Sequence, residues 1–98
     1  MKEKLENLGV SSYVYEELIS TDPATLSNLE LNWDTVSQNI KYLKSLGLTC
    51  IDELLLYSSL VFMLNPSDLE NKIKRLDKDT FTAEVNEDFF KIEKLYQD

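Results

Sequence analysis

The sequence predicts an all-α fold, a compact domain built from helices that short connections join. Three observations predict it. Apolar residues recur at spacings of three and four along most of the chain, which is the period of a helix with one buried face. Residues typical of helix ends separate these runs. The 98 residues include only two Gly and two Pro, which leaves little material for the turns that a sheet needs.

The beginning of the chain shows two helix signals and a turn. Residues 2–8 form a short helix that Gly9 ends, because glycine readily adopts the left-handed conformation that follows a helix. Ser11 is a suitable cap for a second helix that runs to about residue 20. Proline cannot continue a helix, so we expect Asp22-Pro23 to break it and residues 23–26 to form a short turn.

A third helix is expected after Asn32, whose side chain can cap it. Its apolar residues recur at helical spacing and are Trp33, Val36, Ile40, Leu43 and Leu46. Gly47 ends this helix. Thr49 with Asp52 then resembles a capping box and predicts a fourth helix through about residue 58.

The second half of the chain continues the helical pattern. Residues 60–64 have one β-branched side chain and no obvious partner strand, so we expect a buried helical turn there. Asn65-Pro66 is a cap followed by proline at the first helical position, and one face continues with Leu69, Ile73 and Leu76. Residues 77–80 are predicted to form a polar connection between two helices. A last helix then carries the apolar stripe Phe81, Val85, Phe89, Ile92 and Tyr96.

Two parts of the chain resemble each other. LENLG at residues 5–9 matches LKSLG at residues 43–47, and residues 32–43 match residues 65–76 in cap, apolar positions and basic tail. A match that keeps both helix ends and periodicity indicates an internal repeat.

The repeat predicts two helix–turn–helix units, about residues 2–43 and 43–76, and a capping helix at about residues 81–97. Neither unit can bury its own apolar face without a neighbour. We therefore expect one domain of 98 residues, a size that supports a single modest core.

The second unit, LKSLGLTCIDELLLYSSLVFMLNPSDLENKIKRL, resembles one repeat of the mitochondrial transcription termination factor (mTERF) family. Such a repeat contains leucine-x-x-leucine-glycine, a capped helix, a proline turn ending in leucine, and an amphipathic helix. Residues 23–26 match the proline turn of the first unit, whereas Val61 replaces that proline in the second. The resemblance covers roughly residues 5–76. It implies a left-handed superhelix and nucleic-acid binding through a basic concave surface.

The charges are segregated along the chain, and their sum of −8 argues against the simplest nucleic-acid binder. No Lys or Arg occurs between residues 5 and 40, where acidic residues are frequent. A small basic strip is predicted from the ends of two helices, with Lys41, Lys44, Lys72, Lys74 and Arg75 as nucleic-acid-binding candidates. The simpler interpretation is that these cations complement helix dipoles.

Chemical catalysis has little support in the sequence. There is no histidine, and the single cysteine, Cys50, is expected to be a small buried residue. The two adjacent acidic pairs, Glu16-Glu17 and Asp52-Glu53, do not form a site, because neighbouring side chains on a helix point about 100° apart. We predict no enzyme, no catalytic residue, no cofactor and no metal. The single cysteine, the charged start and the lack of a long apolar run predict a soluble, cytoplasmic protein without a membrane segment.

The leading hypothesis is therefore a small non-catalytic helical scaffold that binds a protein partner, with a regulatory role as one option. Its candidate contacts are an acidic face and aromatic residues near helix starts, namely Glu16, Glu17, Tyr13, Tyr15 and Trp33. The simpler interpretation is that these acids belong to the ordinary solvated surface and that the aromatic side chains cover the ends of the core.

Three other hypotheses stay open. One is an mTERF-like, transcription-linked nucleic-acid-binding module that uses the basic strip. Another is an acidic inhibitor that occupies a basic surface of another protein. The apolar stripe of the last helix, finally, can either cap the repeat stack or pair with a second copy to form a homodimer.

Overall fold

The computed structural model describes residues 1–96, which contain helices and no strand, so the predicted all-α class is confirmed. The first part of the chain forms α1 (Lys2–Asn7), α2 (Ser12–Thr21) and α3 (Pro23–Leu31). The middle forms α4 (Trp33–Ser45), α5 (Ile51–Tyr57) and the 3-10 helix η1 (Ser59–Met63). The last part forms α6 (Pro66–Arg75), α7 (Lys78–Glu87) and the 3-10 helix η2 (Phe89–Leu95). No helix in residues 1–96 has the length and apolar character needed to cross a membrane.

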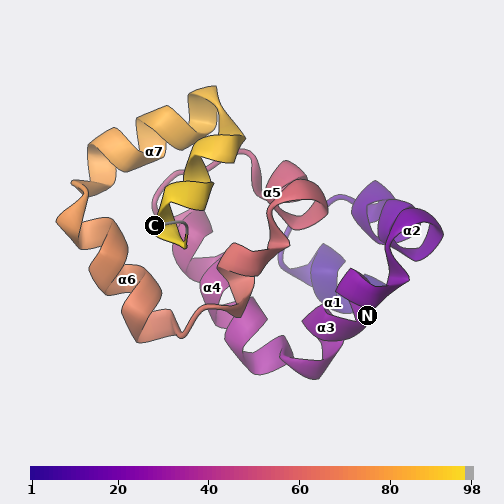
Figure 1. Ribbon diagram of the computed structural model, residues 1–98. Helices are drawn as coiled ribbons and strands as arrows, with labels where there is room; N and C mark the ends of the chain where they lie inside the picture. Colours follow the sequence, from indigo (N-terminus) through magenta and orange to yellow (C-terminus); the bar gives the residue numbers. More distant parts are fainter. Residues whose placement is uncertain (97–98) are drawn as a thin grey trace.

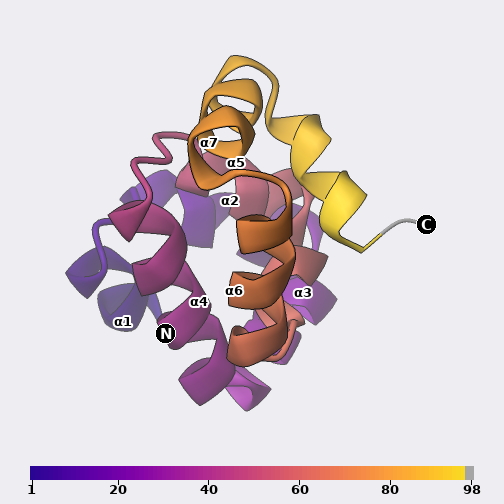
Figure 2. The same ribbon diagram turned by 90° about the vertical axis from the view of Figure 1, so that its left-hand side faces the viewer.

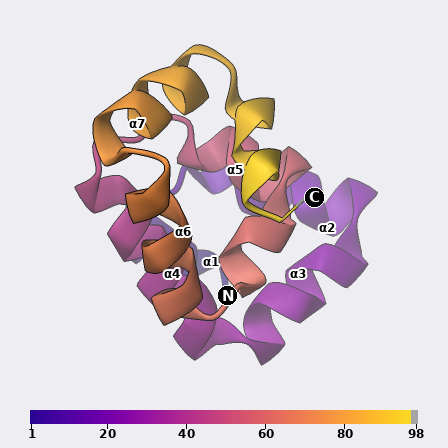
Figure 3. The same cartoon turned by 60° about the vertical axis from the view of Figure 1, so that its left-hand side comes forward.

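The helices are arranged around a central group. α4, α5 and η1 lie between α1–α3 on one side and α6–α7 on the other (Figure 1). α4 runs beside α6 (Figure 2) and also packs against η1, α3 and α5. η2 turns back from α7 and packs against α5, α6 and η1, as Figure 3 shows from another side. The radius of gyration of 12.7 Å is that of a compact chain of this length.

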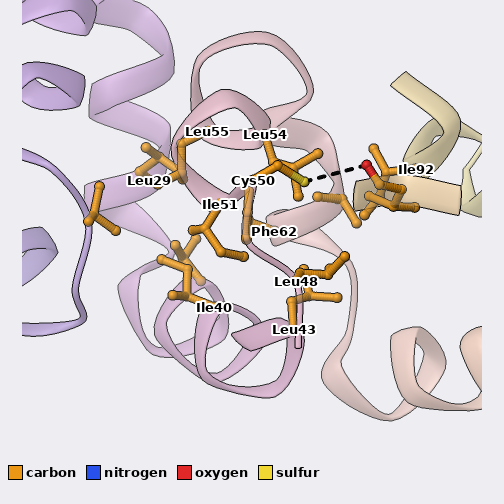
Figure 4. Packing of buried hydrophobic residues seen from close by; sticks show 14 of the residues in the cluster. Leu29, Ile40, Leu43, Leu48, Cys50, Ile51, Leu54, Leu55, Phe62 and Ile92 are labelled. Atoms are coloured by element: carbon orange, nitrogen blue, oxygen red, sulfur yellow. Dashed lines mark hydrogen bonds between the residues drawn. The ribbon is translucent and has the colours of Figure 1, made fainter. Parts of the chain in front are cut away.

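One apolar core runs from α1 to η2, and Figure 4 shows its centre around Leu54, Ile51 and Phe62. The predicted helical stripes supply much of it. The fully buried members of these stripes are Val36, Ile40, Leu43, Leu69, Ile73, Phe81, Val85 and Ile92. Leu76, which was predicted on the buried face of its helix, is 39% exposed because it follows the end of α6.

Three of the predicted helix ends are confirmed. Gly9 and Gly47 have φ of +85° and +97°, the left-handed conformation in which a side chain is unfavourable. The Asn65 carboxamide oxygen accepts hydrogen bonds from the backbone N–H groups of Ser67 at 2.9 Å and Asp68 at 3.3 Å. This cap, with Pro66 at the first position, starts α6.

The predicted short turn at residues 23–26 is wrong, because these residues begin α3, a helix of nine residues. The Asp22 carboxylate caps it by accepting from the backbone N–H of Thr25 at 3.2 Å. Pro23 stands at the first helical position, where its missing N–H costs nothing. The same Asp-Pro pair that ends α2 therefore starts a helix.

Other predicted caps have different partners. The Asn32 side chain donates to the Asn28 carbonyl at 2.9 Å in α3, rather than capping α4. Ser11 occupies the cap position of α2 without a side-chain hydrogen bond. The capping box of Thr49 and Asp52 does not form. The Thr49 hydroxyl lies 3.2 Å from the Asn86 carboxamide oxygen, and Asp52 accepts from the Ser11 N–H at 3.1 Å.

The predicted last helix is two helices, and residues 77–80 are not a connection. Asp77, at φ +65°, caps α7 by accepting from the backbone N–H of Asp79 at 3.3 Å and from the Thr80 hydroxyl at 3.0 Å. Asp88 is extended and ends α7, and its carboxylate accepts from the Phe90 N–H at 3.1 Å to start η2. The break lets both segments face the core from different directions. The predicted end at residue 97 lies outside the described residues.

The helical turn predicted at residues 60–64 is confirmed as η1. The fully buried side chain of Asn39 in α4 holds it. The amide nitrogen of Asn39 donates to the carbonyls of Phe62 at 2.9 Å and Leu64 at 2.7 Å. These bonds satisfy two carbonyls at the end of a short helix, where no helical N–H reaches them.

We expect Asn39→Ala to lower the free energy of unfolding by about 2–4 kcal/mol, because two buried carbonyls lose their donors. Urea denaturation followed by circular dichroism measures this. Asn71→Ala on the exposed face of α6 is the matched control and should change stability by less than about 0.5 kcal/mol. Equal effects of the two substitutions would contradict the role of Asn39.

Candidate protein-binding surfaces

The predicted acidic face of α2 is partly engaged within the fold. The Glu16 carboxylate pairs with the Lys2 ammonium at 2.9 Å, which ties α1 to α2 and raises the pKa of Lys2 through this hydrogen bond and charge. An exposed pair of this kind contributes little to stability. Glu17 is exposed at the next position of the helix. The two acids therefore do not form one converging site.

The two tyrosines of α2 have different surroundings. Tyr15 is half-buried and packs against the core, as the simpler interpretation predicted. Tyr13 is 49% exposed. Burial raises the pKa of the Tyr13 phenol, and the nearby charges of Asp52 and Glu53 in α5 raise it further. Tyr13 thus lies where α2 meets the acidic first turn of α5.

Trp33 lies at the turn between α3 and α4. Its ring is half-buried against the core, and the Lys4 ammonium lies 5.9 Å from its centroid, within reach of a cation–π interaction. The turn holds a pocket of about 320 Å³ whose lining includes Trp33, Glu30 and Asp34. Trp33 therefore offers part of its face to solvent beside two acids.

Leu31, the last residue of α3, completes this site. It is 82% exposed, the largest exposed fraction among the large apolar side chains described. Leu31 lies two residues after the buried Leu29, about 200° around α3, so it faces away from the core. We call Glu30, Leu31, Trp33 and Asp34 the Leu31–Trp33 corner.

The basic strip predicted from the sequence is divided among several places. The Lys44 ammonium donates to the Leu8 carbonyl at 2.5 Å, and that of Lys72 donates to the Leu95 carbonyl at 2.8 Å. Lys74 pairs with Glu70 of its own helix at 3.0 Å. Lys41 and Arg75 are exposed and have no hydrogen bond or ion pair within residues 1–96. Three of the five cations thus make contacts inside the protein.

Cys50 lies in the core, as predicted. Its sulfur faces the Val85 carbonyl at 3.7 Å (Figure 4). Burial raises the pKa of the Cys50 thiol, and the charge of Glu53 adds to this effect. Within residues 1–96 no group of His, Cys, Asp or Glu side chains is placed to hold a metal ion.

Several exposed apolar residues were missed by the sequence reasoning. Leu31 was not singled out, although its place just before a helix cap was a usable signal. Phe90, which follows the stripe residue Phe89, is 52% exposed, and Tyr57 is 62% exposed at the end of α5. Their exposure depends on how α5 and η2 pack, which local periodicity does not report.

Comparisons with protein-family models, curated proteins and solved structures give no match for this chain. The mTERF resemblance therefore stays a prediction from the sequence. The function of the protein has to be inferred from the surfaces described above.

We expect the Cys50 thiol of the native protein to react with a disulfide reagent at pH 8 at least about tenfold more slowly than that of the urea-unfolded chain. The reason is that the folded pKa is raised above the ordinary thiol value, so the thiolate is scarcer at this pH, and the sulfur is also buried. Absorbance of the released thiol measures the rate. Fast, complete reaction of the folded protein would contradict this.

Proposed function

We propose that this protein is a small non-catalytic helical scaffold that binds a protein partner through the Leu31–Trp33 corner. The observation that carries the proposal is an 82% exposed Leu31 beside the partly buried Trp33, between two carboxylates. Aromatic residues are frequent among the anchors of protein interfaces. Covering Leu31 and the exposed part of Trp33 removes apolar surface from water, which favours association.

The charge around the corner indicates the chemistry of the partner. Glu30 and Asp34 flank the apolar residues, and the cation near them, Lys4, lies over the Trp33 ring. A complementary partner presents an apolar side chain between Lys or Arg residues. If the partner uses this basic surface for its own activity, the contact blocks that surface. The protein then acts as the acidic inhibitor hypothesised from the sequence.

The two-unit, mTERF-like organisation is part of this proposal. In its support, Gly9 and Gly47 end α1 and α4 in the same left-handed conformation, and α2 and α5 follow them. The units also differ, since α3 has nine residues and its counterpart η1 has five. The nucleic-acid role that the resemblance implies would depend chiefly on Lys41 and Arg75. We therefore rank that role below protein binding.

Affinity capture from an extract of the source organism tests the corner. A partner retained by the wild-type protein should bind Leu31→Ala about tenfold more weakly, because the apolar contact is lost. Trp33→Leu, which keeps an apolar group against the core, should weaken binding in the same direction. Leu60→Ala, which truncates another leucine, 63% exposed in η1, is the matched control and should bind normally.

The affinity of each variant for the purified partner is then measured by calorimetry. Glu30→Gln with Asp34→Asn should reduce the dependence of the affinity on salt, since two charges are removed from the contact. A partner that binds Leu31→Ala and Trp33→Leu as tightly as wild type would contradict the proposal.

For nucleic acid we expect no salt-sensitive binding in a fluorescence anisotropy titration with DNA or RNA at low salt. The reason is the net charge of −8 and the use of Lys44, Lys72 and Lys74 within the fold. Binding that weakens with added salt and with Lys41→Ala or Arg75→Ala would favour the nucleic-acid role instead. Leu60→Ala again serves as a control without charge change.

A further inference from the structure

A second exposed apolar surface crosses three helices that are distant in the sequence. Tyr13 of α2 is 49% exposed, Tyr57 of α5 is 62% exposed and Phe90 of η2 is 52% exposed, with Phe89 half-buried beside them. α5 lies between α2 and η2 and contacts both (Figure 1). We call these four residues the aromatic strip. It shares no residue with the Leu31–Trp33 corner.

The rings of the strip lie close to one another. The ring centroids of Tyr57 and Phe89 are 5.8 Å apart with their planes inclined by 24°, and those of Phe89 and Phe90 are 4.5 Å apart at 36°. Tyr13 continues the strip on α2, which packs against α5, the helix that ends at Tyr57. Tyr57 and Phe89 are stacked on each other, so the rings that offer π-surface to a ligand are the exposed ones of Tyr13, Tyr57 and Phe90, which form a platform.

Carboxylates lie at the Tyr13 end of this platform. Asp52 and Glu53, in the first turn of α5, both act on the Tyr13 phenol. Asp52 uses one oxygen to accept from the Ser11 N–H, and neither acid has an ion pair within residues 1–96. Glu17 follows Tyr13 by four residues on the same face of α2.

The cations of η2 do not pair with these acids within residues 1–96. Lys94 pairs with Glu84 of α7 at 2.5 Å, and Lys91 is exposed without an ion pair in this part of the chain. Asp52 and Glu53 are therefore available to a cation from another molecule. A ligand that fits must offer positive charge and a flat face at the same time.

We infer that the aromatic strip binds an arginine-bearing segment of another protein, with guanidinium groups stacked on Tyr13 and Tyr57 and paired with Asp52 and Glu53. The planar guanidinium stacks on aromatic rings and pairs with carboxylates through two parallel hydrogen bonds. The ammonium of lysine has no flat face and is more strongly hydrated, so it gains less at such a surface. Phosphate-bearing ligands would be repelled by the carboxylates.

A second copy of this chain fits the strip poorly. Arg75 is the only arginine in the sequence, and two copies that each carry a net charge of −8 repel each other. The buried stripe of α7 and η2, with Phe81, Val85 and Ile92 fully enclosed, is occupied within the single chain. The strip therefore fits a different, basic protein.

The test is a pair of synthetic peptides with equal charge, in which three arginines or three lysines are separated by glycine and serine. Each is titrated into the isotope-labelled full chain and followed by NMR chemical shifts. We expect the arginine peptide to bind at least about fivefold more tightly than the lysine peptide. Its shifts should concentrate at Tyr13, Tyr57, Phe89 and Phe90.

Variants separate this site from the corner. Tyr57→Ala and Glu53→Gln should each weaken the arginine peptide at least about threefold, whereas Leu31→Ala and the matched Leu60→Ala should leave its affinity unchanged. Tyr57 is 62% exposed, so its truncation is expected to preserve the fold, which circular dichroism checks.

Three results would overturn the inference. They are equal affinity for the two peptides, shifts located at the Leu31–Trp33 corner, or an unchanged affinity of folded Tyr57→Ala. Sedimentation that shows a dimer of the free chain broken by Tyr57→Ala would assign the strip to a second copy instead.

Discussion

The buried amide of Asn39 is the contact on which the middle of the structure depends. It joins the central helix α4 to the carbonyl of Phe62 in η1 and to that of Leu64, which directly follows η1. A carboxamide has two N–H groups, so a single side chain can satisfy both carbonyls without a water molecule. Because Leu64 directly precedes the Asn65 cap, the same contact also sets where α6 starts alongside α4.

Both candidate surfaces arise where a helix is interrupted. Leu31 is the last residue of α3, Tyr57 is the last residue of α5, and Phe89 and Phe90 open η2 after the break at Asp88. Leu31, Tyr57 and Phe90 lie off the buried faces of their helices, so their side chains stay exposed. The ends of these short helices therefore leave aromatic and aliphatic side chains in contact with water at defined places.

The distribution of charge gives these surfaces one sign. Several cations make contacts within the protein. Lys44 and Lys72 donate to backbone carbonyls, and Lys94 pairs with Glu84. Acidic side chains stand beside the Leu31–Trp33 corner and beside Tyr13. The apolar surfaces thus carry carboxylate borders, which supports a basic protein as the partner of each and accounts for ranking nucleic acid lower.

The sequence by itself determined the all-α class, the stops at Gly9 and Gly47, the Asn65-Pro66 start of α6 and the helical turn before it. The two stops and the start of α6 depend on contacts within about four residues along the chain, whereas the helical turn is also held by Asn39, which lies 23 and 25 residues from its two carbonyl partners. It also pointed to Trp33 and Tyr13, since both stand near helix starts. Only the tertiary structure decided that Thr49 and Asp52 bind Asn86 and Ser11 instead of each other. The exposure of Leu31 follows locally from its position about 200° around α3 from the buried Leu29. The aromatic strip was decided by the tertiary structure, because it joins side chains of three helices that are distant in the sequence.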